Sequence, residues 1–152
     1  MHARTAEVAT TLVWIDSEEA IIVRWADRAT VERVRSDVEG RHRSTGHMRV
    51  EPAVRHGGGG PSAAALERAR REHIRAFVDD VIAHVPEPDD VTVVGPGAVR
   101  QHLERALRAD DRRHSRPRLV RSATSDRLSE RALVAHVREL AGDAPRRRTV
   151  PA

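Results

Sequence analysis

The most chemically suggestive part of the sequence is a glycine-rich segment followed at once by an arginine-rich one. Residues 55–62 read RHGGGGPS and lead directly into AAALERARREHIRAFVDDVIAHV. Consecutive glycines let a backbone approach a ligand closely, and the guanidinium group of arginine is a planar fork that suits phosphate. Because glycine loses the most backbone entropy on ordering, we expect the four-glycine loop to be mobile in the free protein.

Four aspartates near predicted strand ends offer a second chemistry. Carboxylates there can bind magnesium for phosphodiester cleavage, although strand ends are also ordinary places for aspartate in turns. We favour the turn interpretation over a nuclease for Asp16, Asp89, Asp90 and Asp126. Three histidines precede the glycines without cysteine partners, and their spacing matches no helix-based zinc motif. We expect His42, His47 and His56 to be exposed or phosphate-facing loop residues, with no metal and no cofactor bound.

The sequence VVGPG at residues 93–97 is a third candidate, because a strand-to-helix turn can hold an anion on the helix N-terminus. No lysine follows it, as one would in a phosphate-binding P-loop. Arg100 stands where the third glycine of a dinucleotide fingerprint belongs. We therefore favour a tight structural turn.

A long helix must carry the arginine-rich stretch. Apolar residues recur at three- and four-residue spacing across residues 61–85, from Leu66 to Val85. Their density is high from Ile74 onward and low before it, so the second half should pack on a sheet while the first half projects. Pro61 suits the first helical turn, and Pro86 ends the helix. The projecting half carries Arg68, Arg70, Arg71 and Arg75.

The remaining segments alternate between strands and helices. Strands are predicted at residues 11–15, 20–25, 31–38, 48–50, 91–94 and 118–122. Helices are predicted at residues 98–109 and from a Ser129 cap to about residue 140. This order favours an α/β fold, a mixed sheet with flanking helices. The 152 residues fit one domain at residues 11–142, with an N-terminal extension at 1–10 and an arginine-rich flexible tail at 143–152.

Composition excludes several classes of protein. The absence of cysteine excludes disulfides, thiol catalysis and cysteine-zinc sites. No apolar run approaches a membrane span, and the first residues lack the core of a secretory signal, so we expect a soluble cytoplasmic protein. All 27 basic residues are arginine. Residues 41–75 and residues 100–121 each carry eight arginines against three acidic residues, which is typical of an RNA-binding face or of ordinary solvated helices.

The aromatic residues are only Trp14, Trp25 and Phe77, and their apolar neighbours place them in the core. A base-stacking surface is therefore not expected. Any contact with nucleic acid should be mainly to phosphate and to shape.

Residues 55–62 and the helix after them resemble the middle domain of eukaryotic and archaeal class-1 peptide-release factors. There a basic residue, His, Gly, a variable residue, Gly, Gly, Gln and Ser lead into an arginine-rich helix. The matching residues are Arg55, His56, Gly57, Gly58, Gly59, Gly60 and Ser62, then Leu66, Glu67, Arg68, Ala69, Arg70 and Glu72. The glutamine position is Pro61.

The likeness extends over residues 11–140, and TLVWIDSEEAIIVRW also resembles the opening hairpin of short bacterial translational-machinery proteins. It implies a ribonuclease-H-like fold. It also implies a partner among the ribosome, rRNA and tRNA, and no membrane. The implied contacts are the matched residues of the loop together with Arg68, Arg70, Arg71 and Arg75.

In that family the Gly-Gly-Gln loop enters the peptidyl-transferase centre and promotes hydrolysis of peptidyl-tRNA. The glutamine positions the reacting groups through its backbone N–H and its side-chain amide, and Pro61 has neither. Losing one preorganised donor typically costs about 10²–10³ in rate. The resemblance therefore implies a degenerate loop at Gly59, Gly60 and Pro61, in a translation-related factor without release activity that acts in rescue, silencing or stress.

Two alternatives stay open. The first is a peptidyl-tRNA hydrolase with an altered loop, in which Ser62 or His56 would replace the glutamine. The second is an interaction module without an RNA partner, in which the arginines of the helix pair with its own acids. The spacings Arg68–Glu72 and Glu67–Arg70 allow such pairs.

Overall fold

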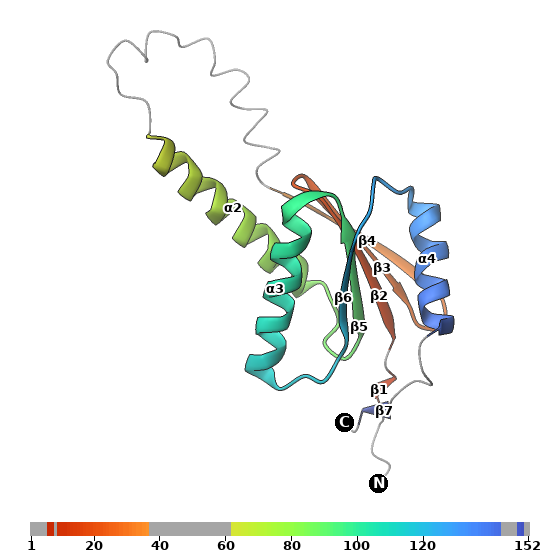
Figure 1. Ribbon diagram of the computed structural model, residues 1–152. Coiled ribbons are helices and arrows are strands. Elements are labelled where there is room, and N and C mark those ends of the chain that lie inside the picture. The colour runs from red at the N-terminus through yellow and green to blue at the C-terminus, as the bar shows by residue number, and fades with distance from the viewer. Residues whose placement is uncertain (1–5, 8, 37–61, 144–148, 151–152) are drawn as a thin grey trace.

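A five-stranded mixed sheet forms the centre of the molecule (Figure 1). The computed structural model describes residues 6–7, 9–36, 62–143 and 149–150. The strands lie in the order β4-β3-β2-β5-β6; β2, β3 and β4 are antiparallel neighbours, and β5 and β6 run parallel to β2. Their bounds are β2 Thr10–Ile15, β3 Glu19–Trp25, β4 Ala29–Arg35, β5 Asp90–Gly95 and β6 Val120–Thr124.

The β2–β3 hairpin closes on an aspartate, as the sequence predicts for a polar turn. Asp16 Oδ1 accepts hydrogen bonds from the backbone N–H groups of Glu18 at 2.8 Å and Glu19 at 2.9 Å. Its own N–H donates to the Glu19 carbonyl at 3.0 Å. This local bonding fixes the register that places Ile15 opposite Ala20, so the inward side chains of both strands stay buried.

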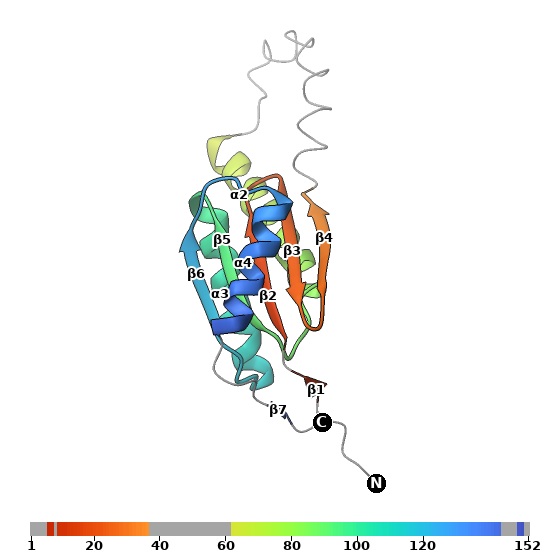
Figure 2. The same cartoon turned by 90° about the vertical axis from the view of Figure 1, so that its right-hand side faces the viewer.

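Helices cover both faces of the sheet. Helices α2 (Ala63–Ala83) and α3 (Gly97–His114) lie on one face, and α4 (Glu130–Asp143) lies on the other (Figures 1 and 2). The alternation of side chains along β2 separates two cores: Val13 and Ile15 face α2 and α3, whereas Leu12 and Trp14 face α4. The α/β fold class predicted from the sequence, a mixed sheet with flanking helices, is confirmed.

Most predicted elements are present with shifted ends. Helix α3 is predicted to stop at residue 109 but runs to His114, because Arg112, Arg113 and His114 suit the negative end of the helix dipole. Strand β6 begins at Val120 rather than at residue 118, because the Arg118 side chain is turned inward to the Asp111 carboxylate. The Ser129 cap of α4 is confirmed: its hydroxyl accepts from the Ala132 N–H at 3.1 Å.

The ends of the predicted long helix also differ from expectation. Helix α2 begins at Ala63 with Ser62 as its N-cap, so the placement of Pro61 in its first turn is wrong.

The strand predicted at residues 31–38 corresponds to β4, which ends at Arg35. The predicted strand at residues 48–50 and the histidines at 42, 47 and 56 lie outside the described residues.

Short strands β1 (Ala6–Glu7) and β7 (Thr149–Val150) pair antiparallel. This pairing joins part of the segment predicted as an extension to part of the segment predicted as a flexible tail. The domain boundaries at residues 11 and 142 stay predictions.

The turn after β5 needs glycine for steric reasons. Gly95 has φ of +150°, and a Cβ there would lie 2.1 Å from the Ile15 carbonyl oxygen. No side chain fits so close to a neighbouring strand. The tight structural turn predicted at residues 93–97 therefore explains why glycine occupies position 95.

Candidate nucleic-acid interface

Helix α2 has two halves with different surroundings. Its C-terminal half buries Phe77, Val78 and Val81 against the sheet. Its N-terminal half extends beyond the sheet and α3 (Figure 1), and Leu66 there is 54% exposed. The predicted projection of the first half is therefore confirmed, and the change in apolar density at Ile74 was the signal for it.

The projecting half of α2 begins at a capping serine. Ser62 Oγ accepts a hydrogen bond from the Ala65 N–H at 3.1 Å, and the Leu66 N–H donates to the Ser62 carbonyl at 3.0 Å. Such a cap satisfies backbone donors that have no intrahelical partner. Ser62 was predicted as a residue of the RNA-contacting loop, and in the structure its side chain is engaged by the helix.

The arginines of the projecting half have exposed and unpaired guanidinium groups. These arginines form no ion pair with any residue in the described part of the chain, although Glu67 and Glu72 have the three- or four-residue spacing that allows ion pairs on a helix. The pairs Arg68–Glu72 and Glu67–Arg70 are thus absent from the structure. The four residues are Arg68, Arg70, Arg71 and Arg75.

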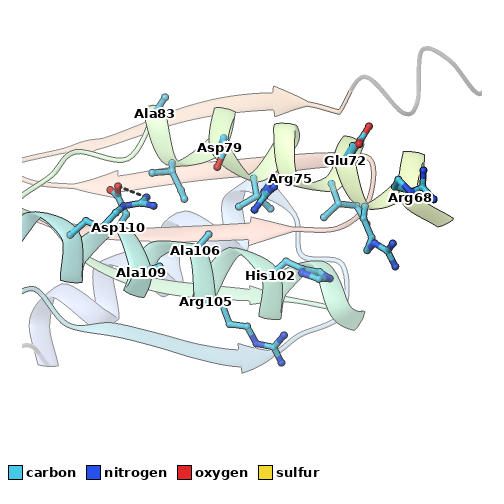
Figure 3. Close-up of a pocket in the computed structure, with 15 residues that line it drawn as sticks. Arg68, Glu72, Arg75, Asp79, Ala83, His102, Arg105, Ala106, Ala109 and Asp110 are labelled. Atoms are coloured by element: carbon cyan, nitrogen blue, oxygen red, sulfur yellow. Dashed lines mark hydrogen bonds and ion pairs between the residues drawn. The ribbon is translucent and has the colours of Figure 1, made fainter. Parts of the chain in front are cut away.

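A groove of about 890 Å³ lies between α2 and α3, and we call it the α2–α3 groove (Figure 3). At one end its walls carry basic side chains from both helices; at the other end they carry alanines and aspartates. Ile74, Val78, Ile82 and Ala106 add apolar surface to the groove. The basic end is lined by Arg68, Arg71 and Arg75 of α2 and by His102 and Arg105 of α3, with Glu72 among them.

Sequence reasoning missed the α3 wall of this groove. Residues 100–121 were recognised as basic, but no pattern in them singles out His102 or Arg105. The loop residues that were predicted to contact RNA lie outside the described residues: Arg55, His56, Gly57, Gly58, Gly59, Gly60 and the altered Pro61.

Other arginines of residues 100–121 are held in ion pairs. Arg116 contacts Asp110 at 2.5 Å and Glu87 at 2.8 Å, and Arg118 contacts Asp111 at 2.9 Å. The hydrogen bond from Arg116 lowers the pKa of the Asp110 carboxyl, and the hydrogen bond to Asp110 raises the pKa of Arg116. These guanidinium groups hold the end of α3 to the loop before β5, so they are not available for a ligand.

The aspartates considered for magnesium have structural roles. Asp89 is buried, accepts from Thr11 Oγ1 at 2.8 Å and pairs with Arg24 at 2.5 Å. It precedes β5, whereas Asp16 follows β2, so the two lie at opposite ends of parallel strands. Asp126 accepts the Trp14 indole N–H through its backbone carbonyl at 3.0 Å. Within residues 9–36 and 62–142, no three His, Asp or Glu side chains gather as metal ligands.

Glu19 forms a third ion-pair centre, at the β2–β3 hairpin. Burial raises the pKa of its carboxyl, but the hydrogen bond and charge of Arg127, together with Arg33, outweigh burial and lower it. Arg127 also lies 4.6 Å from the centre of the Trp14 ring. These contacts fix α4 against the sheet.

The fold and this surface define an α/β domain that presents an arginine-rich helix. No family model matches the sequence, and no curated protein matches it. Among solved structures, the Pelota protein of Thermoplasma acidophilum is similar to 90% of this chain, with a TM-score of 0.46 and 14% sequence identity. The chain spans only 34% of the length of that protein. No helix in the described part of the chain is long and apolar enough to cross a membrane.

Proposed function

We propose that this chain is a translation-related factor that associates with ribosomal RNA or tRNA through the projecting half of α2. The observation that carries the proposal is a set of exposed guanidinium groups that form no ion pair with the described residues, at Arg68, Arg70, Arg71 and Arg75. The helix that carries them begins directly after the segment that resembles the release-factor loop. Exposed arginines without partners are suited to phosphate.

Within this proposal the loop does not hydrolyse peptidyl-tRNA. Proline at position 61 has no N–H and no amide, so it cannot supply the donors that the family's glutamine provides. The hydroxyl oxygen of Ser62 accepts a hydrogen bond as the N-cap of α2, which fixes this side chain to the start of the helix. The factor would occupy a site on the ribosome or tRNA without releasing the peptide.

The alternative of an interaction module without RNA would gain weight from arginines paired with local acids. In the described chain the pairs that would support it are absent, so the free charge of α2 favours a polyanionic partner. The partner assignment to the ribosome rests on the resemblance of residues 55–62.

Co-sedimentation with ribosomes over a salt series tests the association. We expect binding at low salt that falls steeply as salt rises, because phosphate contacts release counterions. The triple variant Arg68→Gln/Arg70→Gln/Arg71→Gln should lose most of it. The matched control, Arg28→Gln/Arg121→Gln/Arg131→Gln, removes three other exposed, unpaired arginines and should bind nearly as wild type. Absence of binding at low salt would refute the proposal.

A peptidyl-tRNA hydrolysis assay tests the loss of chemistry. We expect no turnover by the purified protein. Turnover that Gly60→Ala abolishes would show that the altered loop is still active. Turnover that Gly60→Ala leaves unchanged would place the chemistry elsewhere in the chain.

A further inference from the structure

The α3 wall of the α2–α3 groove is not explained by the projecting half of α2 alone. Arg105 lies on α3, lines the groove and is exposed, and its side chain extends outward from α3 (Figure 3). It makes no ion pair with any residue of the described chain. We propose that the basic end of this groove binds the phosphate backbone of double-stranded RNA; this rests on the proposed function only in taking RNA as the partner.

The charge in the groove changes along its length. Arg68, Arg71 and Arg75 of α2 and His102 and Arg105 of α3 line the part of the groove nearer the N-termini of both helices. Toward the C-terminal ends, the walls carry Asp79, Asp110 and Arg113, and Asp110 is paired with both Arg113 and Arg116. A polyanion is therefore attracted mainly to the basic end of the groove.

The partner is a duplex rather than a single strand because the groove offers little on which a base can stack. Trp14 and Phe77 are buried, and Trp25 is covered by Arg138 at 5.6 Å from its ring centre. The sequence has no other Trp, Tyr or Phe. Unpaired bases are usually held by stacking on such side chains. In a duplex the bases already stack on each other, and a protein can recognise phosphate and shape alone.

The partner is RNA rather than DNA because a carboxylate lies among the arginines. Glu72 lines the groove, is exposed and forms no ion pair within the described chain. A carboxylate repels phosphate, but it accepts a hydrogen bond from a hydroxyl group. The 2′-hydroxyl of RNA supplies that donor beside each phosphate, and DNA lacks it.

Fluorescence anisotropy with a labelled RNA duplex of about 20 base pairs tests the inference. This length suffices because small domains that bind double-stranded RNA span about 16 base pairs. The full chain should bind the duplex more tightly than either separated strand and more tightly than a DNA duplex of the same sequence. Raising the salt concentration should weaken the binding. The variant Arg75→Gln/Arg105→Gln should bind about tenfold more weakly and show a salt slope smaller by about two, one for each lost phosphate contact.

A control exists outside the groove. Arg112 of α3 and Arg121 of β6 are exposed and form no ion pair within the described chain, and neither lines the groove. The variant Arg112→Gln/Arg121→Gln has the same loss of charge. This variant should keep most of the duplex affinity. Circular dichroism should show all variants folded.

The outcomes separate this inference from the proposed function. Equal losses in the two double variants would show a diffuse charge effect and overturn the groove assignment. Equal binding of single strands, or of DNA, would overturn the assignment to an RNA duplex. If ribosomes co-sediment but no RNA duplex binds, the inference fails and the proposed function stands. If the duplex binds through Arg75 and Arg105 but ribosomes do not, the inference stands and the proposed function fails.

Discussion

Residues 41–75 and residues 100–121 each carry eight arginines against three acidic residues, yet their described arginines differ in surroundings. In the first stretch, Arg68, Arg70, Arg71 and Arg75 are exposed without ion pairs in the described chain. In the second, Arg116 and Arg118 contact three carboxylates, and the Arg118 side chain is only 3% exposed. Segments of equal charge thus leave their arginines exposed in one case and use them in ion pairs within the fold in the other.

The difference follows from where each helix lies. The N-terminal half of α2 extends past the sheet, and its arginines form no ion pair with any residue that the structure describes. The end of α3 packs beside the loop after α2, which brings Glu87 to Arg116 and the backbone carbonyl of Pro86 to Arg118. Arg105 belongs to the second stretch but resembles the first, because it lies on the α3 face that lines the α2–α3 groove.

The largest effect is expected from removing the buried guanidinium of the second stretch. Arg118→Met leaves the buried Asp111 carboxylate with only a 3.5 Å contact to Arg116, and should lower the free energy of unfolding by about 3 kcal/mol. Urea denaturation measures the loss. The double variant Arg118→Met/Asp111→Leu should recover part of it. A loss below about 1 kcal/mol in the single variant would show that this pair does little for the fold.

A smaller effect, with a defined pH dependence, is expected at Arg116. Its hydrogen bond lowers the pKa of Asp110 from an ordinary value of 3.8, so the stabilisation is present above that value and is lost as pH falls through the folded pKa. Arg116→Gln should cost about 1 kcal/mol at neutral pH. The cost should shrink on acidification below pH 3.8. A cost independent of pH would assign the effect to packing.

The Ser62 cap of the projecting half of α2 should contribute about as much to stability as Arg116, but its effect should be confined to the start of the helix. Ser62→Ala removes the acceptor for the Ala65 N–H and should cost about 1 kcal/mol of helix stability. Hydrogen exchange should speed up in the first turn of α2 and stay unchanged around the buried Phe77. Faster exchange at both places would show that the two halves of the helix unfold together.

The smallest effect on stability is expected from the free arginines. Arg71→Gln/Arg75→Gln should change the free energy of unfolding by no more than about 0.5 kcal/mol, because neither side chain is buried or ion-paired in the described chain. Urea denaturation at low salt, run beside Arg118→Met, makes the comparison direct. A loss as large as that of Arg118→Met would mean that both stretches stabilise the fold.

Sequence patterns were sufficient for the elements and for the two halves of α2. The apolar runs at residues 11–15 and 20–25 predict strands, and the onset of dense apolar residues at Ile74 predicts where α2 meets the sheet. Both signals are local, because each comes from residues adjacent in the sequence. The start of β6 was less predictable, because it depends on the contact between Arg118 and Asp111.

The sequence by itself determined which segments are basic, that they carry arginine only, and that proline stands at position 61. Only the tertiary structure decided which arginines are free. Ion pairing joins residues far apart in the chain, as Arg116 with Glu87 or Arg24 with Asp89, and a count of charges along a segment carries no information about such partners. The α2–α3 groove has the same origin, because its two walls come from helices separated by strand β5.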